Sequence, residues 1–119
     1  MKRLFLAVLF ALSLGGETWA FSSQRTDQLL WDCLGQTPAG MGELGRLSCG
    51  KYLDGIMDMH SIAVGRKMPP VYCIPPSGIS MDQAMRIFID WANKHPKELH
   101  TTARTSVVIA LRDAFPCSR

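Results

Sequence analysis

Residues 73–83 read CIPPSGISMDQ and mark the place where a proline-rich loop gives way to a helix. The two adjacent prolines lack backbone N–H groups and have fixed φ angles, so regular structure cannot run through them. Ser80 stands three residues before Gln83, which is the spacing of a capping box at the start of a helix. We therefore predict that residues 65–78 form a loop and that a helix begins after Ser80.

Apolar residues recur at spacings of three and four on both sides of this loop, which is the pattern of helices with one buried face. The predicted helices cover residues 24–34, 43–64, 81–95 and 96–114. No segment shows the sustained alternation of a strand. The predicted fold class is all-α, a small four-helix domain.

The second predicted helix is the longest, and we expect its apolar stripe to be buried. Gly50 and Gly55 lie inside it, and each costs about 1 kcal/mol relative to alanine. We therefore expect a neighbouring segment to approach closely at both glycines. The residues of the stripe are Leu44, Leu47, Leu53, Ile56, Met57, His60 and Val64.

An even number of cysteines in a small exported chain predicts two disulfides, for which the sequence allows three connectivities. The third and fourth helices meet at a very short connection at residues 95–96, so we expect an antiparallel hairpin whose open end brings Cys73 beside Cys117. Cys33 and Cys49 flank a glycine-rich turn between the first two helices. The helix arrangement thus favours pairing Cys33 with Cys49 and Cys73 with Cys117.

The N-terminus has the features of a cleavable secretory signal peptide over residues 1–20. Two cations precede an apolar run over residues 4–14, and small residues stand before the predicted cut. The run is too short to cross a bilayer, which takes about 20 apolar residues. We expect an exported protein without a membrane anchor, with a single domain over residues 21–119.

The histidines and cysteines raise the question of catalysis or metal binding. A nucleophilic Cys73 would need a free thiol, whereas cysteines in an oxidising compartment tend to pair. His95 and His100 are five residues apart with Pro96 between them, whereas zinc-binding helices carry histidines four apart on one face. We expect His60 to be a hydrogen-bonded core residue. No enzyme activity, metal or cofactor is expected.

The charged residues are scattered along the chain, which carries a formal net charge of +3. A nucleic-acid-binding protein gathers its basic residues on one face or in a run. We therefore expect no nucleic-acid partner. A small, disulfide-linked helical protein without catalytic groups most often acts by binding another protein.

Short motifs follow Cys33 in a defined order and spacing. They are CGKYLDGIMD at residues 49–58, CIP at 73–75, GISMDQ at 78–83, HPKELH at 95–100 and AFPC at 114–117. In order and spacing these motifs resemble the Rap/Tai family of type VI secretion immunity proteins over nearly the whole mature chain. The resemblance implies a periplasmic, mostly helical protein that binds and blocks a peptidoglycan amidase effector. It also implies a homodimer.

The proline-rich loop departs from the family pattern. The family runs from C-L-P through one residue into G-V-T, whereas Pro76 and Ser77 together place one more residue before Gly78. This loop is the predicted contact surface, so the added residue bears on the choice of partner. The predicted partner-binding residues are Arg66, Lys67, Met68, Tyr72, Pro76 and Ser77.

The alternative function is that of a periplasmic stress protein or chaperone without a toxin partner. Acid-stress chaperones expose apolar surface when acid protonates their carboxylates, and this chain has only 10 Asp and Glu residues in total. Acid titration separates the two functions. Dimer dissociation and strong binding of an apolar dye near about pH 2 to 3 would favour the chaperone.

Overall fold

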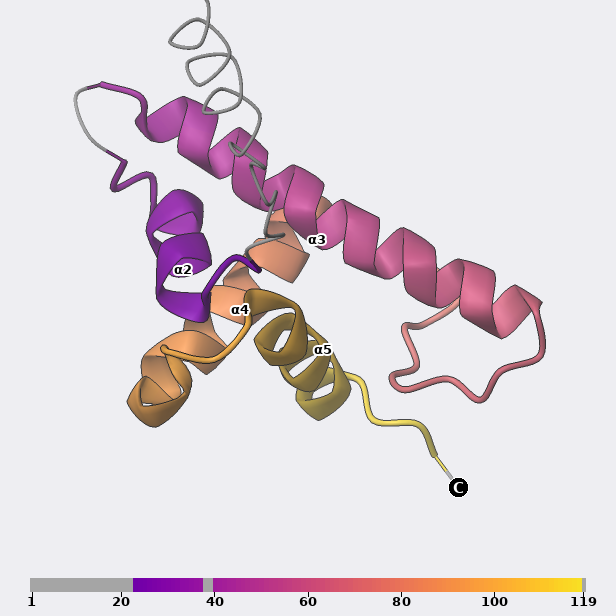
Figure 1. Ribbon diagram of the computed structural model, residues 1–119. Helices are drawn as coiled ribbons and strands as arrows, with labels where there is room; N and C mark the ends of the chain where they lie inside the picture. The colour runs from indigo at the N-terminus through magenta and orange to yellow at the C-terminus, as the bar shows by residue number, and fades with distance from the viewer. Residues whose placement is uncertain (1–22, 38–39, 119) are drawn as a thin grey trace, which may run out of the picture.

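The computed structural model describes residues 23–37 and 40–118. Its helices are α2 (Thr26–Leu34), α3 (Gly42–Gly65), α4 (Met81–Lys94), the 3-10 turn η1 (Pro96–Glu98) and α5 (Ala103–Ala114). The predicted all-α fold is confirmed. The long helix α3 runs across the molecule, and α2, α4 and α5 gather on one side of it (Figure 1). The predicted signal peptide, residues 1–20, lies outside the described residues.

The core lies where the helices meet, and every α-helix contributes a fully buried side chain to it. Leu29 of α2, Leu53 of α3, Phe88 of α4 and Leu111 of α5 are each at most 1% exposed. Removing apolar surface from water stabilises a fold by roughly 25 cal/mol per Å².

In the described ranges, none of the helices is long and apolar enough to cross a membrane.

The start of α4 confirms the prediction drawn from residues 73–83. The backbone N–H of Gln83 donates to Ser80 Oγ at 3.1 Å. Within the preceding loop, the N–H of Gly78 donates to the carbonyl oxygen of Pro75 at 2.8 Å and closes a turn. Gly78 has a φ angle of +73°, a left-handed conformation that favours glycine.

The apolar stripe of α3 is buried only in its middle, so the prediction of a continuous buried face was wrong. Leu53 is fully buried, whereas Leu44 and Leu47 are each 59% exposed and Val64 is 40% exposed. The reason is geometric, because the other helices are shorter than α3 and do not cover both of its ends (Figure 1). Gly50 lies against α4, where a Cβ atom would stand 3.4 Å from Met81 Cγ, as predicted.

The last helix begins at Ala103 rather than at Pro96, which corrects the predicted boundary. The intervening backbone bonds to the start of α2 instead of continuing as a helix. The carbonyl oxygens of Leu99 and Thr101 accept from the N–H groups of Asp27 and Thr26, each at 2.9 Å. The first N–H groups of a helix lack partners within it, so these two bonds satisfy donors of α2.

Both predicted disulfides are present. Cys33 of α2 bonds to Cys49 of α3, and Cys73 in the loop bonds to Cys117 after α5. The second pair forms although residues 95–102 replace the short connection that we expected between α4 and α5. The loop and the C-terminal tail also lie together through a backbone bond, from the N–H of Cys73 to the carbonyl oxygen of Phe115 at 2.9 Å.

Candidate partner-binding surface

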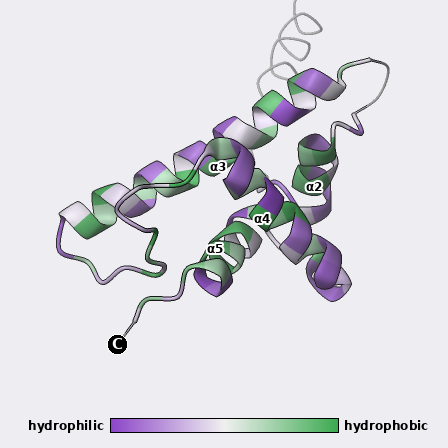
Figure 2. Ribbon diagram, turned by 180° about the vertical axis from the view of Figure 1, so that it is seen from behind, coloured by the Kyte–Doolittle hydropathy of each residue, from purple (hydrophilic) through white to green (hydrophobic). Residues whose placement is uncertain are grey.

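The C-terminal part of α3 extends past the other helices and carries exposed apolar side chains beside the loop over residues 66–80, which we call the stapled loop. Figure 2 shows hydrophobic residues on this part of α3. Met59 is 65% exposed and Ile62 is 54% exposed, while Met68 and Val71 in the loop are 58% and 51% exposed. Groups of exposed apolar side chains mark sites of interaction.

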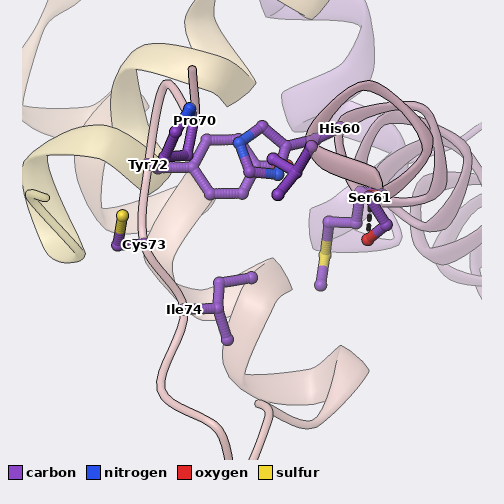
Figure 3. Close-up of a pocket in the computed structure, with 8 residues that line it drawn as sticks. His60, Ser61, Pro70, Tyr72, Cys73 and Ile74 are labelled. Carbon is purple, nitrogen blue, oxygen red and sulfur yellow. Dashed lines mark hydrogen bonds between the residues drawn. The ribbon is translucent and has the colours of Figure 1, made fainter. Parts of the chain in front are cut away.

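A stacked pair of rings fixes the stapled loop to α3. The rings of His60 and Tyr72 are nearly parallel, at an angle of 15°, with their centroids 3.8 Å apart (Figure 3). The backbone N–H of Val71 donates to His60 Nε2 at 3.2 Å. The predicted hydrogen bond of His60 is thus present, but this side chain is half-buried and lies at the edge of the core.

Five of the six predicted partner-binding residues are exposed, and the sixth is buried. Tyr72 is only 1% exposed, so in the free protein it holds the loop in place and does not present a contact surface. Pro76 and Ser77 are exposed in the turn that Gly78 closes, so the residue added relative to the family pattern lies in this turn. The exposed residues are Arg66, Lys67, Met68, Pro76 and Ser77.

Lys67, the second residue after α3, has a backbone conformation that non-glycine residues seldom adopt. Its φ angle is +64°, and the next residue, Met68, donates its N–H to the carbonyl oxygen of Ala63 at 3.1 Å. Glycine is the usual residue at this position of a helix end. Neither Arg66 nor Lys67 forms an ion pair with another residue of the described ranges.

The His60–Tyr72 stack borders two hollows. The loop hollow, shown in Figure 3, has a volume of 410 Å³, and the α3–α5 groove on α5's side has a volume of 480 Å³. Besides the stack, the loop hollow is lined by Met57, Ser61, Val64, Pro70, Cys73 and Ile74. The α3–α5 groove is lined by Tyr52, Gly55, Ile56, Met59, Ala63, Val71, Arg104 and Val108.

Gly55 forms part of the open side of the α3–α5 groove. A Cβ atom built on it would meet no heavy atom within 4 Å, so the close approach that we expected at this glycine is absent. Within residues 23–37 and 40–118, no three His, Cys, Asp or Glu side chains lie close enough to hold a metal ion. The means of binding that this surface offers to a partner are therefore its shape, its apolar contacts and its positive charges.

The sequence was also compared with models of known protein families. The family model of Rap1a immunity proteins matches residues 25–117. This chain belongs to the Rap1a immunity protein family. The match covers every described helix, both disulfides and the stapled loop, and it confirms the resemblance drawn from the motifs. A search of curated proteins gives no match.

Membership of the Rap1a immunity proteins makes the chain an immunity protein of type VI secretion, whose partner is a protein effector. Proteins of this kind are typically not enzymes, and they are often periplasmic. The two disulfides of this Rap1a immunity protein are consistent with export, because disulfides persist in oxidising compartments.

Sequence reasoning missed two features of this Rap1a immunity protein. The first is the contact between His60 and Tyr72, which lie on different elements. The second is Arg104, which lies in the first turn of α5 and lines the α3–α5 groove. The sequence does hint at Arg104, because a cation near the N-terminus of a helix interacts unfavourably with the helix dipole. Such a residue is expected to have a role other than stabilising its own helix.

The two tyrosines of the chain give a pH-dependent test of this packing. Burial raises the pKa of Tyr72 above 10.0. Burial also raises the pKa of Tyr52, and it outweighs the charge and backbone of Arg104, which lower it. The raised pKa values mean that the folded state favours the neutral phenol of both tyrosines. Their contribution to the stability of the fold is therefore complete below pH 10.0 and is lost as the pH rises through the folded-state pKa values.

We expect tyrosinate absorbance of the folded protein to appear at higher pH than that of the denatured protein. A Tyr72→Phe variant assigns the remaining transition to Tyr52. A folded-state titration that coincides with the denatured one would show that neither ring is packed as described.

Proposed function

We propose that this immunity protein is exported, loses residues 1–20 and binds a peptidoglycan amidase effector in the periplasm, neutralising it by direct contact. The family match over residues 25–117 carries this proposal. The disulfides support it, because they suit the oxidising compartment where an amidase meets the cell wall.

We further propose that the stapled loop makes the contact. Three constraints hold the loop before any partner arrives: the ring stack on His60, the Cys73–Cys117 disulfide and the turn closed by Gly78. A preorganised surface loses less conformational entropy on binding than a flexible one. The contacting residues are Arg66, Lys67, Met68, Pro76 and Ser77.

Affinity capture from a type VI-competent strain of the same organism tests the proposal. We expect the oxidised protein to retain a cell-wall amidase. Reversing the charges of Arg66 and Lys67 to glutamate should abolish capture, whereas Lys97→Glu, an exposed charge reversal in η1, should not. Recovery of no cell-wall hydrolase by the unaltered protein would contradict the proposal.

Lys67→Gly separates binding from stability. Glycine adopts the left-handed conformation without the steric cost that lysine bears, about 1 kcal/mol, but it also makes the unfolded chain more flexible. We therefore expect urea unfolding to show no loss of stability, while capture of the effector weakens because the cation is gone. A stable Lys67→Gly variant that captures the effector as well as the unaltered protein would remove Lys67 from the contact surface.

We also propose the homodimer that the family resemblance implies. The end of α3 opposite the stapled loop, together with α2, provides apolar surface for it: Trp31, Leu34, Met41, Leu44 and Leu47 are exposed. Sedimentation equilibrium should give twice the mass of the mature chain, and the variant with Leu44→Glu and Leu47→Glu should give the monomer mass. A monomer at all concentrations of the unaltered protein would contradict the dimer.

A further inference from the structure

The α3–α5 groove has the composition of a binding site. Its walls are mostly apolar, with Met59 and Ala63 from α3, Val71 from the stapled loop and Val108 from α5. Hollows of this size with mostly apolar walls and a few polar groups are typical of binding sites in proteins. Space remains free above Gly55, where an added Cβ atom would meet nothing within 4 Å.

Arg104 gives the groove its charge. It is exposed in the first turn of α5, a turn without acidic residues, and it forms no ion pair with any residue of the described ranges. The N-terminal end of a helix is already positive, so a cation at this place does not stabilise α5. A carboxylate brought beside Arg104 would be attracted both by the guanidinium group and by the helix end.

A second cation lies on the face of α3 that lines the groove. Met59, Ala63 and Arg66 follow one another at spacings of four and three, so they share one face of the helix. Arg66 is exposed and also forms no ion pair within the described ranges. The groove is thus an apolar surface with unpaired positive charge on α5 and at the end of α3.

We propose that the α3–α5 groove is the anchor site for the effector, and that it binds an apolar side chain that lies next to a carboxylate. The apolar side chain fills the space above Gly55, and the carboxylate pairs with Arg104. This inference rests on the proposed function and adds to it the chemistry that the partner must present.

Two small probes of matched shape test the groove without the effector: 3-phenylpropionate and its uncharged amide. With ¹³C-labelled methionine methyl groups, Met59 reports from the groove and Met68 from outside it. We expect a saturable shift of the Met59 signal, with the acid binding about two- to fivefold more tightly than the amide, as suits an exposed ion pair. The Met68 signal should move little.

Matched variants assign this preference to the groove. Arg104→Gln should make the acid bind like the amide, whereas Arg112→Gln, an exposed position in the last turn of the same helix, should keep the difference. Gly55→Leu should abolish the Met59 shift by filling the groove, and circular dichroism should show an intact fold because leucine favours helix. Equal binding of acid and amide, no saturable shift, or binding to Gly55→Leu would each overturn the inference.

The captured effector separates this inference from the proposed function. We expect Gly55→Leu to weaken effector binding by about 30-fold or more, as for loss of an interface hot spot. An amidase that binds Gly55→Leu as tightly as the unaltered protein would overturn the anchor site and leave the immunity function standing. Failure to capture any amidase, with probe binding intact, would count against the proposed function, while the groove's preference for an apolar carboxylate would stand.

Discussion

Replacing Cys73 and Cys117 together by alanine should lower the free energy of unfolding by about 4 kcal/mol and abolish effector binding. The disulfide joins residues 44 apart in the sequence, and a cross-link over that distance restricts the unfolded chain strongly. It also ties the stapled loop to the tail after α5, where the N–H of Cys73 bonds to Phe115. Urea unfolding and effector capture measure the two effects.

The other disulfide is the matched control. Cys33 and Cys49 are 16 residues apart, so replacing both by alanine should cost about 3 kcal/mol. Their bond lies in the core between α2 and α3, away from the stapled loop. We expect this variant to bind the effector under conditions where it is folded. If both double variants lost binding alike, or if the first kept it, the loop would not be the contact surface.

Tyr72→Ala should lower the free energy of unfolding by about 3 to 5 kcal/mol, the cost of removing a large buried aromatic side chain. Tyr72 is 1% exposed and stacks on His60, so its loss also releases the stapled loop from α3. We therefore expect effector binding to fall even at temperatures where the variant remains folded. Thermal unfolding with parallel capture measurements would show both effects.

Tyr72→Phe keeps the ring and should have the opposite effect on stability. The Tyr72 hydroxyl is buried without a hydrogen-bond partner among the described residues, and burying such a group costs about 1 to 3 kcal/mol. Removing it should raise the free energy of unfolding while the stack on His60 remains. If Tyr72→Phe were as destabilised as Tyr72→Ala, the hydroxyl rather than the ring would hold the loop.

Features set by local spacing, by the order of motifs or by the pairing of a few cysteines could be predicted from the sequence. The hydroxyl of Ser80 accepts from Gln83 at the start of α4, and the serine-to-glutamine spacing shows this directly. The disulfide pairs could be chosen because few arrangements of short helices bring four cysteines together two by two. The family could be recognised because the cysteines and the motifs around them occur in a fixed order.

Two features that depend on how distant segments bond to and cover one another could not be predicted. The last helix starts late because Leu99 and Thr101 bond to the first turn of α2, more than 70 residues earlier in the sequence. Leu44 and Leu47 fit the apolar stripe of α3 but have no helix above them in the described structure. A periodic pattern tells which face of a helix is apolar and does not tell how much of its length is covered.

The candidate site was predicted only in outline for the same reason. The proline-rich loop stands out in the sequence, and five of its six predicted contact residues are exposed. The sequence could not show that Tyr72 turns inward onto His60, or that Arg104 from α5 lies beside the same part of α3. Both contacts depend on how the loop folds back along α3.

Peptidoglycan hydrolysis by the captured amidase, measured while the oxidised immunity protein is titrated in, shows whether the protein neutralises the enzyme. We expect hydrolysis to fall in proportion to the added protein and to stop once every amidase molecule is bound. The variant with Arg66 and Lys67 changed to glutamate should leave it running. Hydrolysis that continues unchanged at every ratio of unaltered protein to amidase would show that this protein does not neutralise the enzyme.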